Sequence, residues 1–365
     1  MIRAFARREP LPEPFDAIAV DLAAFQAERV PGYARLCAAR GVDPESITSA
    51  SDAPAVPAEA FKLASVFAFD PVEAVVTFRT SGTTLGARGL HAMRDVGSYD
   101  AAALAFGGAM FAPPLVGPSA ASSASRAPVV VIGASPSEAG DSSLTHMCAL
   151  FARALGVQDV ESAFFVRGAV LEVDRLRAAI ASLSPGTPAI VLATSFGLVH
   201  LLDAVGSETL ALPQGSRVMQ TGGFKGRSRE VSAASLRRDV ARLFALDERS
   251  VVAEYGMTEL SSQFWEATLV DERARHGVYA EPPWARVVPV DPVTLAPVPH
   301  GTVGIARIED LANVDSAFAI LTHDRVRREG ERFELLGREP GAPPRGCSIA
   351  LDEMLSGHDA PRTVR

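Results

Sequence analysis

Apolar positions follow a helical period in the first third of the chain. Between residues 14 and 40 the apolar side chains recur three or four positions apart and are interrupted by a proline, which predicts two helices covering one face of a core. The alanine-rich segment 98–110 is also predicted to be helical. We expect residues 56–62 to form an entry turn. Residues 73–79 are a short run of β-branched and aromatic residues and predict a strand.

The middle of the chain alternates short apolar runs with helical periods. The apolar runs are typical of buried strands and occupy residues 128–132, 189–192, 217–220 and 250–253. The helical periods lie between them, at residues 144–155, 198–205 and 232–244. Because about 30 residues separate successive members of the last three runs, the spacing favours β-α-β crossovers and a mostly parallel sheet.

The pattern changes after Pro282. Short apolar runs separated by proline- and glycine-containing turns predict a compact antiparallel β region with strands at 284–290, 303–308 and 332–336. We therefore expect an α/β fold with mostly parallel sheets flanked by helices, plus a smaller β-rich subdomain. The expected boundaries are residues 1–338 for the core, about 282–338 for the β-rich subdomain and 339–365 for a short tail with one helix near 349–355.

Composition narrows the class of protein. The 365 residues are 48% hydrophobic with a mean hydropathy of +0.16, enough for a large folded core. A net charge of -8 argues against nucleic acid and anionic membrane surfaces as partners. No apolar run approaches the roughly 20 residues that span a bilayer, and Glu9 and three prolines stand where a signal peptide would be apolar. Three cysteines, Cys37, Cys148 and Cys347, fit neither a disulfide framework nor metal spacing, so we expect a cytoplasmic protein.

A stretch rich in glycine and hydroxyl side chains follows the predicted strand at 73–79. Residues 80–89, Thr-Ser-Gly-Thr-Thr-Leu-Gly-Ala-Arg-Gly, hold four hydroxyls, three glycines and one arginine. Glycines let backbone N–H groups approach an anion, and hydroxyls and a guanidinium add donors. The stretch lacks the Walker A pattern, which disfavours a kinase or P-loop enzyme. It predicts a polyphosphate site, and a flexible surface loop is the alternative.

Three further loops of similar chemistry follow predicted parallel strands, at residues 193–197, 221–227 and 254–259. All three are rich in glycine, hydroxyl and charged side chains. Because the carboxyl ends of parallel strands meet at one edge of a sheet, we expect these loops to border one crevice. An aromatic ring, a hydroxyl and a carboxylate in 255–259 suit a nucleotide with Mg²⁺.

These motifs resemble those of the adenylate-forming superfamily, which includes acyl-CoA synthetases, peptide-synthetase adenylation domains and luciferases. Residues 80–84, 255–259 and 322–324, followed by Gly337-Arg338, occur in the superfamily's order. Within it the chain is most similar to the acyl-protein synthetases, the long-chain-fatty-acid luciferin-component ligases and their relatives in secondary metabolism. That closer match rests on Val56-Pro57 with Phe61-Lys62, Thr221–Arg227, Tyr255–Gln263, Asp310–Ser316 and Arg345–Ser348, and it covers nearly the whole chain.

The resemblance implies a fold of the adenylate-forming N-terminal-domain type and an ATP site. It implies that Ser81, Thr83 and Thr84, with Thr80, Gly82 and Arg88 beside them, cradle the β- and γ-phosphates, that Thr258 holds the α-phosphate and that Glu259 binds Mg²⁺. The adenine would lie against Gly222, Gly223, Tyr255 and Gly256, and the ribose hydroxyls would bond to Asp324, with Arg338 nearby. The implied cofactors are ATP and Mg²⁺.

The resemblance also implies a reaction. A carboxylic acid is activated as acyl-AMP with release of pyrophosphate, and the acyl group passes to a protein thiol. Cys347 is placed like the acyl-accepting cysteine, and the flanking Arg345 would favour its thiolate; the alternative is a small residue buried where the tail docks. The expected partners are a small carboxylic acid and an acceptor protein, a reductase or a carrier. Other outcomes are transfer to an amine or a carrier thiol, or a nucleotide-binding interaction protein without catalysis.

One departure concerns the catalytic cation. The superfamily's C-terminal domain, which delivers a lysine, is expected to be absent, because 27 residues follow Arg338 and none is lysine. Lys225 is our candidate for that charge, with Arg227 and Arg88 as others and a solvated basic turn as the alternative. We place the acyl pocket near Ser195, Phe196 and His200 by position alone. Lone histidines, His91, His200 and His323, are interpreted as polar packing residues.

Overall fold

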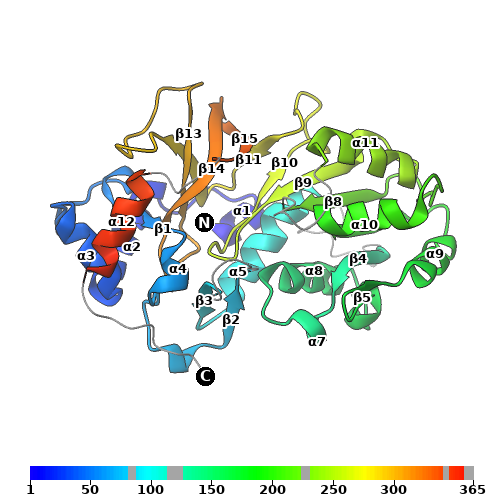
Figure 1. Ribbon diagram of the computed structural model, residues 1–365, viewed down its shortest axis with the longest axis horizontal. Helices are drawn as coiled ribbons and strands as arrows, with labels where there is room; N and C mark the ends of the chain where they lie inside the picture. The colour runs from blue at the N-terminus through cyan, green and yellow to red at the C-terminus, as the bar shows by residue number, and fades with distance from the viewer. Residues whose placement is uncertain (81–87, 113–125, 223–230, 340–344, 357–365) are drawn as a thin grey trace. The chain divides into compact units, whose positions relative to one another are not determined.

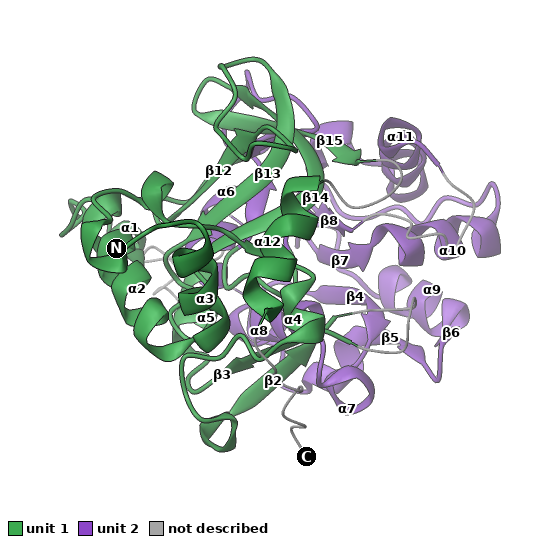
Figure 2. Cartoon of the chain, turned by 60° about the vertical axis from the view of Figure 1, so that its left-hand side comes forward, with its two compact units in different colours: residues 1–102, 257–262, 280–365 green, residues 103–256, 263–279 purple. Residues whose placement is uncertain are grey.

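The computed structural model describes residues 1–80, 88–112, 126–222, 231–339 and 345–356. The chain forms two compact units (Figure 2), and each is described by itself. Unit 1 comprises residues 1–102, 257–262 and 280–365, and unit 2 comprises residues 103–256 and 263–279. Within the described residues, every helix is too short or too polar to span a bilayer.

Unit 2 is built on the predicted parallel sheet. Strands β4 and β5, β4 and β7, β7 and β8, and β8 and β9 all pair in parallel, whereas β10 pairs antiparallel with β9 and β6 antiparallel with β5. The bounds are β4 (Val129–Ala134), β5 (Phe164–Arg167), β6 (Val170–Leu171), β7 (Ile190–Thr194), β8 (Arg217–Thr221), β9 (Val251–Tyr255), β10 (Phe264–Glu266) and β11 (Val278–Ala280). The four predicted strands are confirmed as β4, β7, β8 and β9; β5, β6, β10 and β11 were not predicted.

Helices cover the sheet of unit 2 on both faces (Figure 1). Side chains alternate between the faces of a strand, and the row Val130, Val191, Val218 and Val251 lies in register across β4, β7, β8 and β9. This row packs into a buried cluster with apolar residues of α9, α10 and α11. The helices of this unit are α6 (Gly108–Met110), α7 (Pro136–Ala139), α8 (Ser143–Ala154), α9 (Val173–Ala181), α10 (Ser195–Val205) and α11 (Ala233–Phe244). The predicted helices α8, α10 and α11 are confirmed.

An aromatic cluster fills another part of unit 2. The rings of Phe111 and Trp265 stack with centroids 5.3 Å apart, and Phe151 of α8 meets Trp265 edge-on at 6.1 Å. Gly107 ends the π-helical turn η4 (Ala103–Gly107), and a Cβ there would lie 2.7 Å from Phe151 and 3.0 Å from Trp265. The helix predicted at 98–110 forms, but the π-helical turn η4 interrupts it. Glycine is favoured at position 107 because the rings of Phe151 and Trp265 lie close to the backbone there.

Unit 1 contains an antiparallel meander, with β12 beside β13, β13 beside β14 and β14 beside β15. The bounds are β12 (Ala285–Val290), β13 (Val303–Asp310), β14 (Ala319–Glu329) and β15 (Arg332–Arg338). The three predicted strands are confirmed, but β14 was missed because its second half, from His323 to Glu329, is almost continuously charged. The turn expected at 56–62 is confined to residues 58–59: β1 (Val56–Pro57), which pairs in parallel with β14, precedes it, and α4 (Ala60–Leu63) follows.

The remaining elements of unit 1 are helices and one hairpin. Helices α2 (Phe15–Arg29) and α3 (Pro31–Ala39) confirm the two predicted at 14–40, and α12 (Arg345–Leu355) confirms the helix in the tail. Arg35 of α3 donates through Nε to the Met354 carbonyl of α12 at 2.8 Å. Strands β2 (Val76–Arg79) and β3 (Leu90–Met93) form an antiparallel hairpin, so β2 begins later than predicted. Helices α1 (Ile2–Arg7) and α5 (Gly97–Ala102) complete the unit.

The close approach at Gly107 gives a stability prediction. Gly107→Ala should destabilise the protein by about 1–3 kcal/mol, because the new methyl overpacks Phe151 and Trp265. The matched control is Gly186→Ala, where a Cβ meets nothing within 4 Å and the change should stay within about 0.5 kcal/mol. Denaturant unfolding followed by tryptophan fluorescence measures both. A Gly107→Ala variant as stable as the parent would contradict the packing described.

Candidate active site

The β2–β3 hairpin brackets the predicted polyphosphate stretch. Thr80 closes it, because its N–H donates to the Gly89 carbonyl at 2.9 Å and its Oγ1 accepts from the Gly89 N–H at 2.8 Å. Arg88 donates through Nε to the Thr80 carbonyl at 2.7 Å and through Nη2 to the Arg79 carbonyl at 3.2 Å. These contacts tie the Arg88 guanidinium to the hairpin backbone. Ser81, Gly82, Thr83 and Thr84 lie outside the described residues.

The segment 257–262, which carries Thr258 and Glu259, is held by hydrogen bonds to its backbone. The Thr258 carbonyl accepts from His91 Nδ1 at 2.7 Å, and the Glu259 carbonyl accepts from Asn313 Nδ2 at 2.8 Å. The Ser261 hydroxyl donates to Asn313 Oδ1 at 2.5 Å. The backbone of the two residues expected to contact the nucleotide is therefore fixed by side chains that sequence analysis left without a role.

Asp310 is the deepest member of this network. Its side chain has no solvent exposure. It accepts from the Ser261 N–H at 2.9 Å, the Ser262 hydroxyl at 2.7 Å and the Ala312 N–H at 3.0 Å. Burial raises the pKa of this carboxyl to about 6, against the opposing effect of these hydrogen bonds. Residues 310–316, which sequence analysis used only for family resemblance, are thus the support of segment 257–262.

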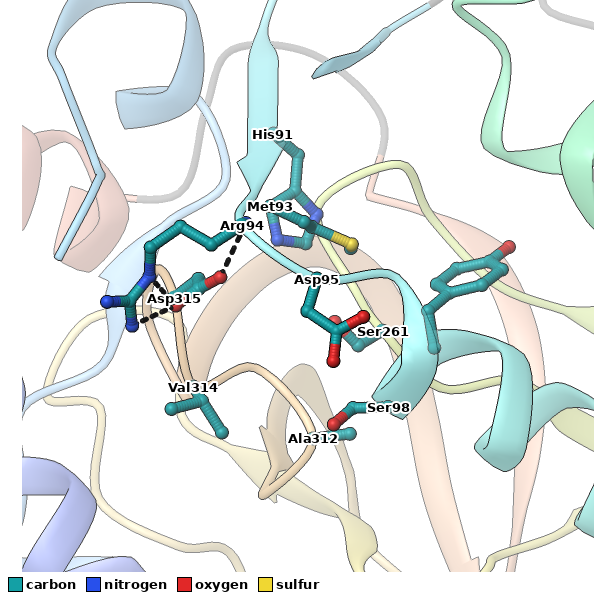
Figure 3. A pocket seen from close by; sticks show the side chains of 10 residues that line it. His91, Met93, Arg94, Asp95, Ser98, Ser261, Ala312, Val314 and Asp315 are labelled. Atoms are coloured by element: carbon teal, nitrogen blue, oxygen red, sulfur yellow. Dashed lines mark hydrogen bonds and ion pairs between the residues drawn. The ribbon is translucent and has the colours of Figure 1, made fainter. Parts of the chain in front are cut away.

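His91 joins the same network from strand β3. Its side chain is 1% exposed, and burial lowers its pKa to about 4, so the imidazole is neutral at neutral pH. Its Nε2 lies 3.1 Å from the Ser316 hydroxyl. His91 borders a cavity of about 290 Å³ that is lined by side chains from β3, α5, segment 257–262 and residues 312–315. Figure 3 shows these side chains. At the rim of the cavity, Arg94 Nη2 pairs with Asp315 Oδ1 at 2.7 Å. The sequence suggested only a polar packing role for His91, whereas in the structure its ring also hydrogen-bonds to Thr258 and Ser316.

Glu259 and Thr258 offer ligands of the kind that a magnesium–nucleotide complex needs. The Glu259 side chain is 8% exposed, and Thr258 is half-buried beside it. Among the described residues, no group of three or more His, Cys, Asp and Glu could hold a metal ion without other ligands. Mg²⁺ in nucleotide enzymes takes one or two carboxylates together with phosphate oxygens and water. One carboxylate and one hydroxyl on a fixed segment therefore fit that group.

Strands β14 and β15 bring two other predicted residues together. Asp324 is paired across the ladder with Arg338, and Arg338 Nε lies 3.5 Å from Asp324 Oδ1, as the expectation of a nearby arginine requires. Two residues earlier on the strand, the Thr322 carbonyl lies 3.9 Å from the Cys347 sulfur. The candidate acyl acceptor thus packs against the strand that carries the candidate ribose ligand.

The environment of Cys347 opposes thiolate formation. The residue lies in α12 and is 2% exposed. Burial, with a smaller effect of the nearby Glu59 carboxylate, raises the pKa of its thiol to about 12. The expected influence of the flanking Arg345 is therefore outweighed in this conformation. Acylation of Cys347 stays a prediction, and it requires the thiol to leave this site.

Unit 2 carries the remaining predicted residues. Gly222 follows the last residue of β8 and has a φ of 73°, a left-handed conformation that favours glycine. Its carbonyl accepts from the Ser195 hydroxyl at 2.7 Å, which joins the start of α10 to the start of the predicted adenine loop. Phe196 and exposed His200 stack edge-on at 4.3 Å. Gly223, Lys225 and Arg227 lie outside the described residues, so the choice of Lys225 as the catalytic cation stays a prediction.

Glu254 is a buried carboxyl that sequence analysis did not single out. It precedes Tyr255 on β9, is 5% exposed and accepts a hydrogen bond from the Thr221 hydroxyl of β8. Burial raises its pKa to about 7, and the Thr221 bond opposes that rise. The hydrogen bond between Thr221 and Glu254 joins the ends of β8 and β9. The residues predicted to contact adenine, Gly222, Tyr255 and Gly256, lie at these two strand ends. The Tyr255 ring packs 6.0 Å from Phe264 and 6.1 Å from Tyr279.

Comparisons with known proteins identify a family and a common fold. The family model described as "Acyl-protein synthetase, LuxE" matches residues 169–356. No curated protein sequence matches the chain. Among solved structures, ATP-bound MatB from Rhodopseudomonas palustris is similar with 14% identity and a TM-score of 0.51, over 73% of this chain and 48% of that one. An open conformation of 2-hydroxyisobutyryl-CoA ligase in complex with 2-HIB-AMP and CoA is similar with 14% identity and a TM-score of 0.62, over 88% of this chain and 68% of that one.

These likenesses confirm the predicted fold class. The chain spans about half the length of the MatB structure that it matches. At 14% identity the two solved structures show a common fold and no more. The family model covers just over half of the chain and includes Thr258, Glu259, Asp324 and Cys347.

The buried Glu254 gives a pH prediction. Because its pKa is raised in the folded state, the folded protein keeps a proton that the unfolded chain releases above its usual pKa. Its contribution to stability should therefore fall as the pH rises from about 5 to 7. Glu254→Gln removes this loss, so the variant should gain on the parent by about 3 kcal/mol between pH 5 and pH 8.

Denaturant unfolding at several pH values measures the difference. Glu272→Gln is the control, because Glu272 is an exposed glutamate of the same unit. A parent–variant difference for Glu254→Gln that does not change between pH 5 and pH 8 would contradict a buried carboxyl with a raised pKa.

Proposed function

The chain belongs to the acyl-protein synthetase family, LuxE, and from this premise we propose that it is a ligase that activates a carboxylic acid with ATP as an acyl-adenylate and then passes the acyl group to a protein thiol. In the first step a carboxylate oxygen of the acid attacks the α-phosphorus, and the bond to the β-phosphate oxygen breaks with release of pyrophosphate. In the second step a thiolate attacks the acyl carbon, AMP leaves, and the thiol proton passes to solvent.

The observation that carries this proposal is the fixed backbone of Thr258 and Glu259. Phosphoryl-type displacement needs positioning and charge neutralisation more than it needs a protein nucleophile. A segment pinned through His91, Asn313 and Asp310 can keep a hydroxyl and a carboxylate in place without reorganisation during the reaction. Mg²⁺, when bound by Glu259, neutralises phosphate charge.

The other nucleotide contacts are assigned by position in the family pattern. We assign the polyphosphate to Thr80–Thr84 with Arg88, and the ribose to Asp324 with Arg338. We assign the adenine to Gly222, Gly223, Tyr255 and Gly256, and the compensating cation to Lys225. The acid would border Ser195, Phe196 and His200.

Cys347 is our first candidate for the acceptor thiol. Its contact with the Thr322 carbonyl supports this choice, because that carbonyl lies two residues from Asp324 on the same strand. Transfer then needs two events, namely release of the thiol from its buried site and loss of its proton. The final acceptor would be a partner protein, such as a reductase or a carrier.

The burial of Cys347 also favours a second candidate function. A thiol that is 2% exposed with a pKa of about 12 is a poor nucleophile where it lies. In that case the acyl-adenylate is attacked directly by an amine or by a carrier-protein thiol, and Cys347 is a packing residue. Both functions begin with the same acyl-adenylate.

Activation is tested by exchange of labelled pyrophosphate into ATP with a panel of carboxylic acids. The parent should exchange with at least one acid. Glu259→Gln should slow exchange about a hundredfold or more, because it removes the metal-binding carboxylate. Glu331→Gln, at an exposed glutamate in the turn after β14, is the control and should behave as the parent. Nucleotide binding by the parent without exchange for any acid would indicate a non-catalytic binding protein.

Self-acylation is tested by the mass of the intact protein after turnover. The parent should gain one acyl group that hydroxylamine removes, as expected for a thioester. Cys347→Ala should gain none, whereas Cys37→Ala, which alters another buried cysteine, should still be acylated. If the parent shows no adduct while the acyl group reaches an added amine or carrier, direct transfer replaces the thiol route.

A further inference from the structure

We propose that His91 is a positioning residue that fixes segment 257–262 from strand β3, so that Thr258 and Glu259 keep one orientation toward the nucleotide. The inference rests on the proposed function, because it concerns the same nucleotide site. Its evidence lies wholly within unit 1, in bonds and packing among described residues.

The position of His91 on the hairpin is the first step. It lies on β3 opposite Phe78 of β2, in the hairpin that brackets the predicted polyphosphate stretch. From there its Nδ1 reaches the Thr258 carbonyl, 167 residues away in sequence, at 2.7 Å. One side chain of strand β3 thus bonds directly to the residue expected at the α-phosphate.

The chemistry of the two bonds fixes the tautomer. A backbone carbonyl can only accept, so Nδ1 carries the proton and donates to Thr258. In the neutral ring Nε2 is then the acceptor, and the Ser316 hydroxyl donates to it at 3.1 Å. His91 therefore bonds to both segments of the buried network, residues 257–262 and residues 310–316.

Packing around the His91 ring restricts its movement and so keeps its hydrogen bonds to Thr258 and Ser316 in place. The ring is 1% exposed and meets Phe61 edge-on at 5.8 Å. Three positions along from His91, Arg94 donates to Asp315 through its backbone N–H at 2.8 Å and through its guanidinium at 2.7 Å and 3.0 Å. The end of β3 is thus bound to residues 315–316 at two points (Figure 3 shows the arginine pair). A displacement of the hairpin would break the bond to Thr258 or carry Thr258 with it.

The competing explanation is that His91 only fills space in the core. Two amide side chains separate the explanations, because each copies one half of the imidazole. Asparagine places its amide nitrogen where Nδ1 lies and can keep the bond to Thr258. Glutamine places its terminal group where Nε2 lies and can keep the bond to Ser316. Both are neutral, polar and smaller than the buried ring that they replace.

The experiment compares parent, His91→Asn, His91→Gln, Ser316→Ala and the destabilised control Gly107→Ala. Pyrophosphate exchange is measured with ATP and acid varied separately, and denaturant unfolding gives the stability of each variant. His91→Gln should lower the maximal exchange rate about tenfold to a hundredfold with the KM for the acid unchanged, as for loss of one buried, oriented hydrogen bond. His91→Asn and Ser316→Ala should stay within about fivefold of the parent.

Two results would overturn the proposal. One is equal impairment of His91→Asn and His91→Gln in step with their loss of stability, which indicates a packing role. The other is a His91→Gln variant as fast as the parent. Gly107→Ala should exchange at the parent's rate, which shows that lost stability alone does not slow the reaction.

Hydrogen exchange of the free protein separates this proposal from the proposed function. His91→Gln should speed amide exchange in peptides covering residues 257–262, and His91→Asn should not. If that difference appears while the parent shows no pyrophosphate exchange with any acid, His91 positions the segment and the proposed reaction is wrong. If it is absent, the positioning role is wrong whatever the activity.

Discussion

A carboxylate without solvent exposure holds the segment on which the proposed chemistry depends. Burying an ionised carboxyl costs several kcal/mol unless its oxygens are satisfied. Asp310 meets that condition with two backbone N–H groups and one hydroxyl, contributed by Ser261, Ser262 and Ala312. Trp284 adds a further bond at 3.0 Å to the Ser262 hydroxyl. Such a network tolerates little displacement, because each broken bond leaves a buried polar group without a partner.

In the parallel sheet of unit 2, a smaller set of side-chain hydrogen bonds likewise fixes the backbone. Its strands are apolar along their length and become polar where they end. There Thr221 bonds to Glu254, and Ser195 bonds to the Gly222 carbonyl. Side chains from one strand end thus fix the backbone of the next, and the loops that follow start from defined positions. In both units, therefore, buried side chains fix the backbone of the loops.

Cys347 illustrates how burial can outweigh a local charge. The neighbouring Arg345 suggests an activated thiol when the sequence is considered alone. In the folded chain the thiol lies on the buried side of α12 against the Thr322 carbonyl, near the Glu59 carboxylate, and both burial and that charge oppose ionisation. The distinction between a reactive and a packed cysteine is thus a property of the conformation.

The sequence by itself determined the elements with strong local patterns: α2 and α3, the parallel strands β4, β7, β8 and β9, and their intervening helices. It also determined the family, through motifs whose order does not depend on packing. It did not reveal β14, because a charged strand lacks apolar alternation, nor the roles of His91, Asp310, Asn313 and Glu254. Those roles arise from hydrogen bonds between residues far apart in the chain, such as His91 and Thr258, and no local period encodes such a pairing. The tertiary structure decided them because burial leaves each polar group dependent on the few partners within its reach.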